Sequence, residues 1–542
     1  MGNRFLKGAM ILTVSMLATR FLGIIYVIPF RGLVSETGMA LYQYAYLPYS
    51  VFISLSTLGI PVGIAKFISK YNADGEYDTS RKIFKYSLFF MFILGMIGFL
   101  TLYLIAPWYA SLVLAGEAVT YNTEAEVTTA IRTVSFALLI IPPMSIFRGF
   151  FQGNQNMVPT AISQFVEQIV RVSLILIGAY VIIHSFERTA RVAVTFAVFA
   201  AFLAGLASFL VLAYFWFKNK KRYNRLLKES VPHQERNIKP LFLELVSYAV
   251  PFAILGLTMN LFQLIDSVTF NNHMIHGAGV PNVLSEQLFG IYSGLLTKII
   301  MIPVAFAIAF GQPLVPELTH HLRSRNKKEV RRILALAIQL TCFVTLPAVV
   351  GLSMLSQPIY RMLFYDANLN QMGGAIFQTG AFIGLFIALY IIITAILQGI
   401  GEQKKGIMFL VMALGIKYIG NFILVPRLQV NGAILADVLA YTFCITMSLL
   451  VIKKKTDFSF RRLLRRLMPI GVFTAMMALI VVLLRMGLSL VIDYEMSRSM
   501  ATVYVLIVGL GGVLTYFILT WYFDLLKSLF GFRISLKALS RR

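Results

Sequence analysis

Charged side chains stand inside long apolar runs of this sequence. A charge at the middle of a lipid bilayer costs at least ~2.5–3.5 kcal/mol on insertion scales, so such a residue faces a protein interior or a water-filled cavity. A cavity lined by arginine and lysine attracts an anion, and the paired donors of a guanidinium fit a phosphate or pyrophosphate. Most of these charges are basic, which favours an anion site; the candidates are Arg20, Arg31, Glu167, Arg171, Asp266, Lys298, Lys417, Asp437 and Arg485.

Two of the basic residues lie near the middle of their apolar runs. Arg20 has no acidic residue three or four positions away in either direction, so its partner must come from another helix or from a bound molecule. Lys298 has the same central position in a later run. We therefore predict that Arg20 and Lys298 bind the anion, with a structural ion pair as the alternative for each.

Three further basic residues have weaker claims to the same role. Arg31 lies near the outer end of its run, where it either joins the site or extends to the membrane interface. Arg171 follows Glu167 by four residues, so the two can pair on one helix face, as a structural or gating pair or as part of the site. Lys417 lies 246 residues after Arg171, and the repeat described below makes it a further candidate.

The acidic residues suggest a second chemistry. Asp266 is almost alone as an acid in its apolar run, and a lone membrane carboxylate is a natural cation or proton site; it could equally neutralise Lys298. For Asp437 we prefer the role of a structural partner to that of a cation site, and for Arg485 we expect a structural role. The sequence leaves coupling to sodium, to protons or to the membrane potential open and indicates no cofactor.

The elements that position these residues are transmembrane helices. Of the 542 residues, 58% are hydrophobic and only 13% are charged, and the mean hydropathy is +0.79, outside the range of soluble domains. Apolar blocks of about 20 residues match the thickness of a bilayer core. We predict an all-α polytopic membrane protein with about 14 transmembrane helices, at 8–34, 41–65, 84–108, 129–150, 160–184, 192–217, 241–270, 285–312, 331–355, 375–399, 406–425, 432–452, 467–490 and 499–523.

The chain also carries a weak internal repeat. Ile60-Pro61-Val62 recurs as Ile302-Pro303-Val304, and Phe151-Gln152-Gly153 recurs as Leu397-Gln398-Gly399. Similar offsets predict two six-helix lobes related by a parallel repeat around a central cavity, with two appended helices. The predicted parts are an N-lobe (1–217), a basic linker (218–240), a C-lobe (241–452), a second basic linker (453–466), the appended helices (467–523) and a basic tail (524–542).

Charge in the loops gives the topology. Most of the 48 basic residues lie at the two ends and in alternate loops, whereas loop 109–128 has three glutamates and no basic residue. We expect a multi-pass protein of the plasma membrane. The positive-inside rule then places both of its termini in the cytoplasm. The net charge of +25 also indicates attraction to membrane lipids. Because basic residues are distributed loop by loop, nucleic acid is not an expected partner.

Signatures of enzymes and metal sites are missing. The sequence has no P-loop, so no nucleotide is expected and no catalytic residue is assigned. His273 and His276 lack an acidic or cysteine partner that would complete a metal site, and Cys342 and Cys444 lie in apolar segments. We expect a transporter rather than an enzyme.

Several motifs resemble a known family. Thr19-Arg20-Phe21-Leu22-Gly23, the stretch from Gly59-Ile60-Pro61-Val62 to Tyr71-Asn72, Arg148-Gly149-Phe150-Phe151-Gln152-Gly153 and Gln164-Phe165-Val166-Glu167-Gln168-Ile169-Val170-Arg171 are similar to the Gram-positive MurJ branch of the MOP (multidrug/oligosaccharidyl-lipid/polysaccharide) exporter superfamily. The resemblance covers essentially the whole chain.

The resemblance implies a flippase for lipid II, the undecaprenyl-pyrophosphate-linked peptidoglycan precursor, that works by alternating access. Arg20 matches the family's cavity arginine of the first helix, and Lys298 falls where the family carries a basic residue in the eighth. Two other family arginines have no match, and Arg31, Arg171 or Lys417 could replace them. The alternatives are a flippase for another polyprenyl-linked glycan, a sporulation-specific paralogue, a multidrug exporter and a non-transporting scaffold.

Overall fold

The computed structural model describes residues 15, 18–19, 22–23, 25–57, 60–115, 121–231, 240, 250–251, 253–324, 326–364 and 369–525. The described residues are helical and contain no strand, and among them eleven helices are long and apolar enough to cross a membrane. These eleven correspond to the predicted third to sixth and eighth to fourteenth helices. The predicted all-α polytopic membrane fold is therefore confirmed, and the three other predicted helices include residues outside the described ranges.

The chain forms two compact units, Met1–Leu295 and Leu296–Arg542. The first contains α2 (Val27–Thr57), α3 (Ile60–Ala73), α4 (Tyr77–Val113), α5 (Glu124–Ser135), α6 (Ala137–Gly153), α7 (Val158–His184), α8 (Ala190–Lys228), α10 (Thr258–Asn272), η1 (His273–Gly277) and α11 (Asn282–Phe289). The π-helical segment η2 (Gly290–Leu296) crosses the division between the units. The lobe boundaries expected from the repeat stay a prediction.

A break in α2 marks the change from the predicted first helix to the second. Ser35 has φ 62° and ψ −178°, a conformation that no α-helix accommodates, so the two helical parts change direction there. The structure thus runs the two predicted helices into one kinked element. Further along, Gly290 packs against the backbone just after this break, because a Cβ at Gly290 would lie 2.1 Å from the carbonyl oxygen of Glu36.

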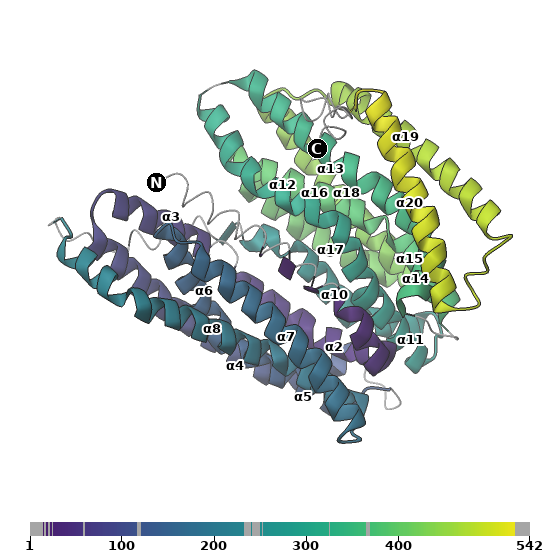
Figure 1. Ribbon diagram of the computed structural model, residues 1–542, viewed down its shortest axis with the longest axis horizontal. Helices are drawn as coiled ribbons and strands as arrows, with labels where there is room; N and C mark the ends of the chain where they lie inside the picture. Colours follow the sequence, from purple (N-terminus) through teal and green to yellow (C-terminus); the bar gives the residue numbers. More distant parts are fainter. Residues whose placement is uncertain are drawn as a thin grey trace, which may run out of the picture. The chain divides into compact units, whose positions relative to one another are not determined.

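Helices α7 and α8 run side by side in the first unit (Figure 1). Their close approach depends on Gly178, since a Cβ there would lie 2.1 Å from a ring carbon of Phe196. Proline near the first turn of α7 suits a helix start, where the missing N–H has no intrahelical partner anyway. Helix α5 begins with a capping box, in which Thr123 and Glu126 each bond the other's backbone N–H.

The second unit contains nine α-helices within its described residues. They are α12 (Thr297–Arg323), α13 (Lys327–Met354), α14 (Ser356–Phe364), α15 (Asn370–Gly380), α16 (Ile383–Gly399), α17 (Gln403–Leu428), α18 (Val430–Thr456), α19 (Phe460–Leu488) and α20 (Arg498–Tyr522). Helices α17 and α18 pack along each other, as do α19 and α20, drawn in yellow-green and yellow in Figure 1. α19 also packs on α13, and α20 packs on α14.

Candidate functional site

Three charged side chains form a cluster among the membrane helices of the first unit. Glu167 on α7 accepts from Nη2 of Arg148 on α6 at 2.7 Å and from Nη2 of Arg171, one turn along α7, at 2.5 Å. One carboxylate thus neutralises one of two guanidinium groups, and the cluster keeps a net positive charge. We call Arg148, Glu167 and Arg171 the arginine cluster.

Neighbouring serines fix Arg148 within this cluster. Its Nε donates to the hydroxyl of Ser163 at 3.1 Å, and its Nη2 donates to the hydroxyl of Ser208 on α8 at 2.8 Å. The Ser208 hydroxyl in turn donates to the carbonyl of Ser163. Contacts from α7 and α8 thus hold Arg148 in place, whereas Arg171 is held by its pair with Glu167.

A row of tyrosines on α2 lies beside Arg171. The rings of Tyr42 and Tyr46 stack with centroids 5.6 Å apart, and Tyr46 meets Tyr49 at 5.7 Å. All three side chains lie near the Arg171 guanidinium, and α2 packs on α7. We call these three residues the tyrosine row.

The arginine cluster retains unused hydrogen-bonding capacity. Within the described structure, Nε of Arg171 is a buried N–H donor without a hydrogen-bond partner. A buried donor that lacks a partner is costly, so such atoms mark places where a ligand or water is expected. Together with the net charge and the aromatic rings, this arrangement suits an anionic molecule that also carries flat or ring-shaped groups.

The structure gives Arg31 a partner that the sequence analysis did not name. Arg31 is 8% exposed and pairs with Glu36, which is 2% exposed, across the break in α2. The Arg31 Nε lies 2.8 Å from Glu36 Oε1. Glu36 lies in the short gap between two predicted helices. A carboxylate at that place could have indicated a partner for Arg31. Arg31 as a substrate-binding residue stays a prediction.

Lys417 is fully buried in the second unit. Its Nζ lies 2.7 Å from Oδ1 of Asp437 on α18 and donates to the carbonyl of Ala433 at 3.0 Å. The structure therefore places Asp437 as the ion-pair partner of Lys417. Arg485 on α19 donates to the carbonyl of Met354, at the end of α13. A substrate-binding role for Lys417 stays a prediction.

Asp266, the predicted cation site, is 1% exposed on α10 and accepts a hydrogen bond from the Tyr292 hydroxyl at 3.0 Å. Lys298 is half-buried at the start of α12. The two residues belong to different compact units, and their pairing stays a prediction. Arg20, the first choice of the sequence analysis, lies outside the described residues.

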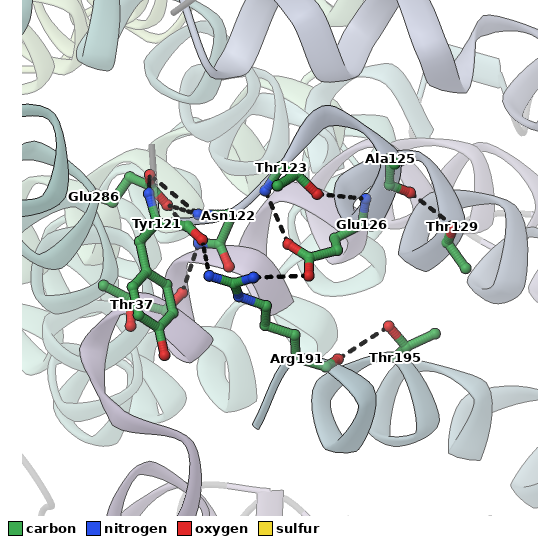
Figure 2. Close-up of polar contacts among 10 residues, drawn as sticks. All are labelled: Thr37, Tyr121, Asn122, Thr123, Ala125, Glu126, Thr129, Arg191, Thr195 and Glu286. Carbon is green, nitrogen blue, oxygen red and sulfur yellow. Dashed lines mark hydrogen bonds and ion pairs between the residues drawn. The ribbon is translucent and has the colours of Figure 1, made fainter. Parts of the chain in front are cut away.

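A second polar network lies at the start of α5 (Figure 2). Glu286 on α11 is 1% exposed and accepts from the backbone N–H of Tyr121 at 2.9 Å and from the Asn122 side chain, while Asn122 also donates to the carbonyl of Thr37 on α2 at 3.0 Å. Glu286 thereby ties the segment before α5 to α2 and α11.

Sequence reasoning did not count Arg148 or Glu286 among the intramembrane charges. Both lie near the ends of their predicted helices, 129–150 and 285–312, where a charge is ordinarily assigned to solvent. Ser163 and Ser208, hydroxyls set among apolar residues, were a usable signal for Arg148. No comparable signal marked Glu286.

Comparison with known proteins gives matches over the length of the chain. The family model for polysaccharide biosynthesis proteins matches residues 5–321. The lipid II flippase MurJ of Bacillus subtilis (strain 168) is 36% identical over 535 residues, which cover 98% of this chain and 98% of that protein.

Two solved structures have a similar fold. One is the lipid II flippase MurJ in an inward closed conformation, with a TM-score of 0.63, 17% identity, and coverage of 95% of this chain and 99% of that one. The other is an inward-facing multidrug resistance MATE family transporter of the MOP superfamily, with a TM-score of 0.64, 18% identity, and coverage of 83% and 99%. At these identities the likeness establishes a shared fold.

Proposed function

Because the chain belongs to the polysaccharide biosynthesis protein family, and within it to the MurJ-type members of the MOP superfamily, we propose that it moves lipid II from the inner to the outer leaflet of the plasma membrane by alternating access. The observation that carries this proposal is the match at 36% identity, end to end, to a protein named as a lipid II flippase. The arginine cluster and the tyrosine row support it, because they offer positive charge and aromatic rings among membrane helices.

The cargo's chemistry assigns roles to the charged residues. Its pyrophosphate presents several acceptor oxygens, which a planar guanidinium engages in pairs. Arg20, Lys298 and Arg171 bind this group. Arg31 and Lys417 already face buried carboxylates, Glu36 and Asp437, so they join the binding only if those pairs open during transport. Asp266 carries a coupling cation or proton, and no cofactor takes part.

The membrane potential favours this direction of transport. The cell interior is negative, and each elementary charge that crosses 100 mV is worth ~2.3 kcal/mol. An anionic headgroup that moves outward is therefore assisted, provided that protein charges moving with it do not cancel the effect.

We also propose that both termini of the protein lie in the cytoplasm. A single cysteine in the 218–240 loop is expected to be shielded from an impermeant thiol reagent in intact cells, whereas one in the 109–128 loop labels. The charge asymmetry of the two loops motivates this orientation. The reverse labelling pattern overturns it.

Depletion of the protein tests the function. We expect lipid II to accumulate on the inner leaflet of depleted cells, and wild-type protein to restore its passage. Arg20→Ala and Lys298→Gln proteins that insert normally but fail to restore it support a transporter. Full restoration by both variants favours a scaffold, accumulation of a different polyprenyl-linked glycan favours a related flippase, and sensitivity to organic cations with normal lipid II favours a multidrug exporter.

A further inference from the structure

A cavity separate from the arginine cluster opens between α5, α7 and α8. Its volume is about 520 Å³, within the ~300–1,000 Å³ typical of small-molecule sites. Ile182, Phe196 and Phe199 give it apolar walls, and Glu126 and Arg191 bring opposite charges to the same cavity. The proposed mechanism does not use this cavity, whose combination of apolar wall and paired charge suits an amphipathic occupant.

The surface beside the cavity is apolar and exposed. Large apolar side chains on α7 and α8, namely Ile177, Tyr180 and Val192, are 63%, 55% and 48% exposed. These helices are long and apolar enough to span a membrane, and such side chains belong against acyl chains. A molecule that enters the cavity therefore comes from the bilayer.

The two charges are paired and remain accessible. Nη1 of Arg191 lies 3.0 Å from Oε1 of Glu126, and the two side chains are 30% and 29% exposed. Arg191 also donates to the carbonyl of Tyr121, and its guanidinium lies over the Tyr121 ring, 4.6 Å from the centroid. A guanidinium has five N–H donors, so Arg191 can donate further hydrogen bonds to an anionic group.

We propose that this cavity binds a zwitterionic glycerophospholipid whose headgroup ends in a primary ammonium. The lipid phosphate accepts from Arg191, the ammonium donates to Glu126, and one acyl chain lies against Phe196 and Phe199. A lipid whose headgroup has a net negative charge binds less well, because the Glu126 carboxylate repels it. Neutral apolar molecules leave both charges unused.

The cavity is connected to the second polar network through Arg191 and Tyr121. Arg191 holds the carbonyl of Tyr121, and the N–H of Tyr121 goes to Glu286, as Figure 2 shows. A lipid phosphate on Arg191 therefore adds a contact to the side chain that fixes the segment before α5. Lipid composition would bear on how firmly this segment is held.

The chain offers a matched control for Arg191. Arg132 on α5 also lies over a tyrosine ring, 4.8 Å from the Tyr103 centroid, and its Nε also donates to that residue's carbonyl. It does not line the cavity. Arg132→Gln therefore removes a comparable arginine while it leaves the proposed site intact.

Native mass spectrometry of the full-length protein tests the proposal. Phosphatidylethanolamine and phosphatidylglycerol with identical acyl chains are added at equal concentration. We expect the wild type to retain phosphatidylethanolamine about tenfold more, the effect of one charge-assisted contact. Arg191→Gln lowers retention of both lipids, and Glu126→Gln, which keeps the helix cap, removes only the preference.

Two results with the wild type and the arginine variants overturn the proposal. One is equal or greater retention of phosphatidylglycerol by the wild type, and the other is the same loss from Arg132→Gln as from Arg191→Gln. Thr195→Trp fills the cavity and keeps both charges, so it separates binding from misfolding if Arg191→Gln is unstable. Undiminished phosphatidylethanolamine retention by Thr195→Trp also contradicts the proposal.

Discussion

Arg171 and Lys417 lie in helices that the predicted repeat makes equivalent, yet their surroundings differ. Arg171 on α7 shares one carboxylate with Arg148 and has 22% of its side chain exposed. Lys417 on α17 pairs with Asp437 and is completely buried. The first cluster therefore holds two guanidinium groups against one carboxylate and keeps a partly exposed arginine, whereas the second is a buried pair of one cation and one carboxylate.

This difference predicts different roles for the two residues, cargo binding for Arg171 and a structural pair for Lys417. A buried ion pair costs several kcal/mol to desolvate, and removal of one partner leaves a buried charge that nothing neutralises. In the arginine cluster the removal of Arg171 leaves Glu167 paired with Arg148. The same substitution is thus expected to damage stability in one unit and transport in the other.

The largest expected effect is on the stability of the second unit. Asp437→Asn leaves the Lys417 ammonium buried without its counter-charge and should destabilise the protein by about 3–5 kcal/mol. Thermal unfolding in detergent and the amount of protein in membranes measure this. The double variant Lys417→Met with Asp437→Leu should recover most of the stability, because apolar side chains can replace a buried pair. Wild-type stability of Asp437→Asn alone would mean that the lysine is not held by this pair.

Arg171→Ala should leave the protein folded and lower transport by at least about tenfold, the effect of losing one charge-assisted contact to the cargo. The measurement is complementation of a flippase-depleted strain, with protein amounts checked by blotting. Arg171→Lys should retain part of the activity, because the charge survives without the paired donors. Normal growth with Arg171→Ala would remove this residue from the substrate site.

An exchange of the two side chains sharpens the comparison. Lys417→Arg places a larger group in a completely buried site and should destabilise the protein by ~1–3 kcal/mol. Arg171→Lys should cost less stability, because 22% of the side chain is exposed and Glu167 stays paired with Arg148. Equal effects in the two positions would show that their surroundings do not differ as described.

The repeat in the sequence predicted that Arg171 and Lys417 correspond, but it could not predict this contrast. Hydropathy placed the helices well, since bilayer thickness dictates the length of an apolar run. The pairing of Glu167 with Arg171 followed from helix geometry alone, because they lie one turn apart. The partners Arg148 and Glu36 depend on which helices pack together and on the break at Ser35, and no local pattern encodes either.

The smallest expected effect concerns the tyrosine row. Tyr46 is half-buried between Tyr42 and Tyr49 and beside Arg171. An aromatic contact is worth ~0.5–1.5 kcal/mol beyond area burial, so Tyr46→Leu should lower transport by a factor of about 2–10. Tyr46→Phe keeps the ring and should transport almost normally.

Tyr103→Leu is the control for Tyr46→Leu. Tyr103 is also half-buried and also lies beside an arginine, Arg132, but it is on α4, away from the arginine cluster. If Tyr103→Leu lowers transport as much as Tyr46→Leu at equal protein levels, the loss reflects general packing of the first unit. If only Tyr46→Leu lowers transport and Tyr46→Phe is near wild type, the aromatic ring of Tyr46 contacts the cargo. Because Tyr46 lies beside Arg171, the double variant of Arg171→Ala with Tyr46→Leu should lose less than the sum of the two single losses if the pair acts together on one molecule.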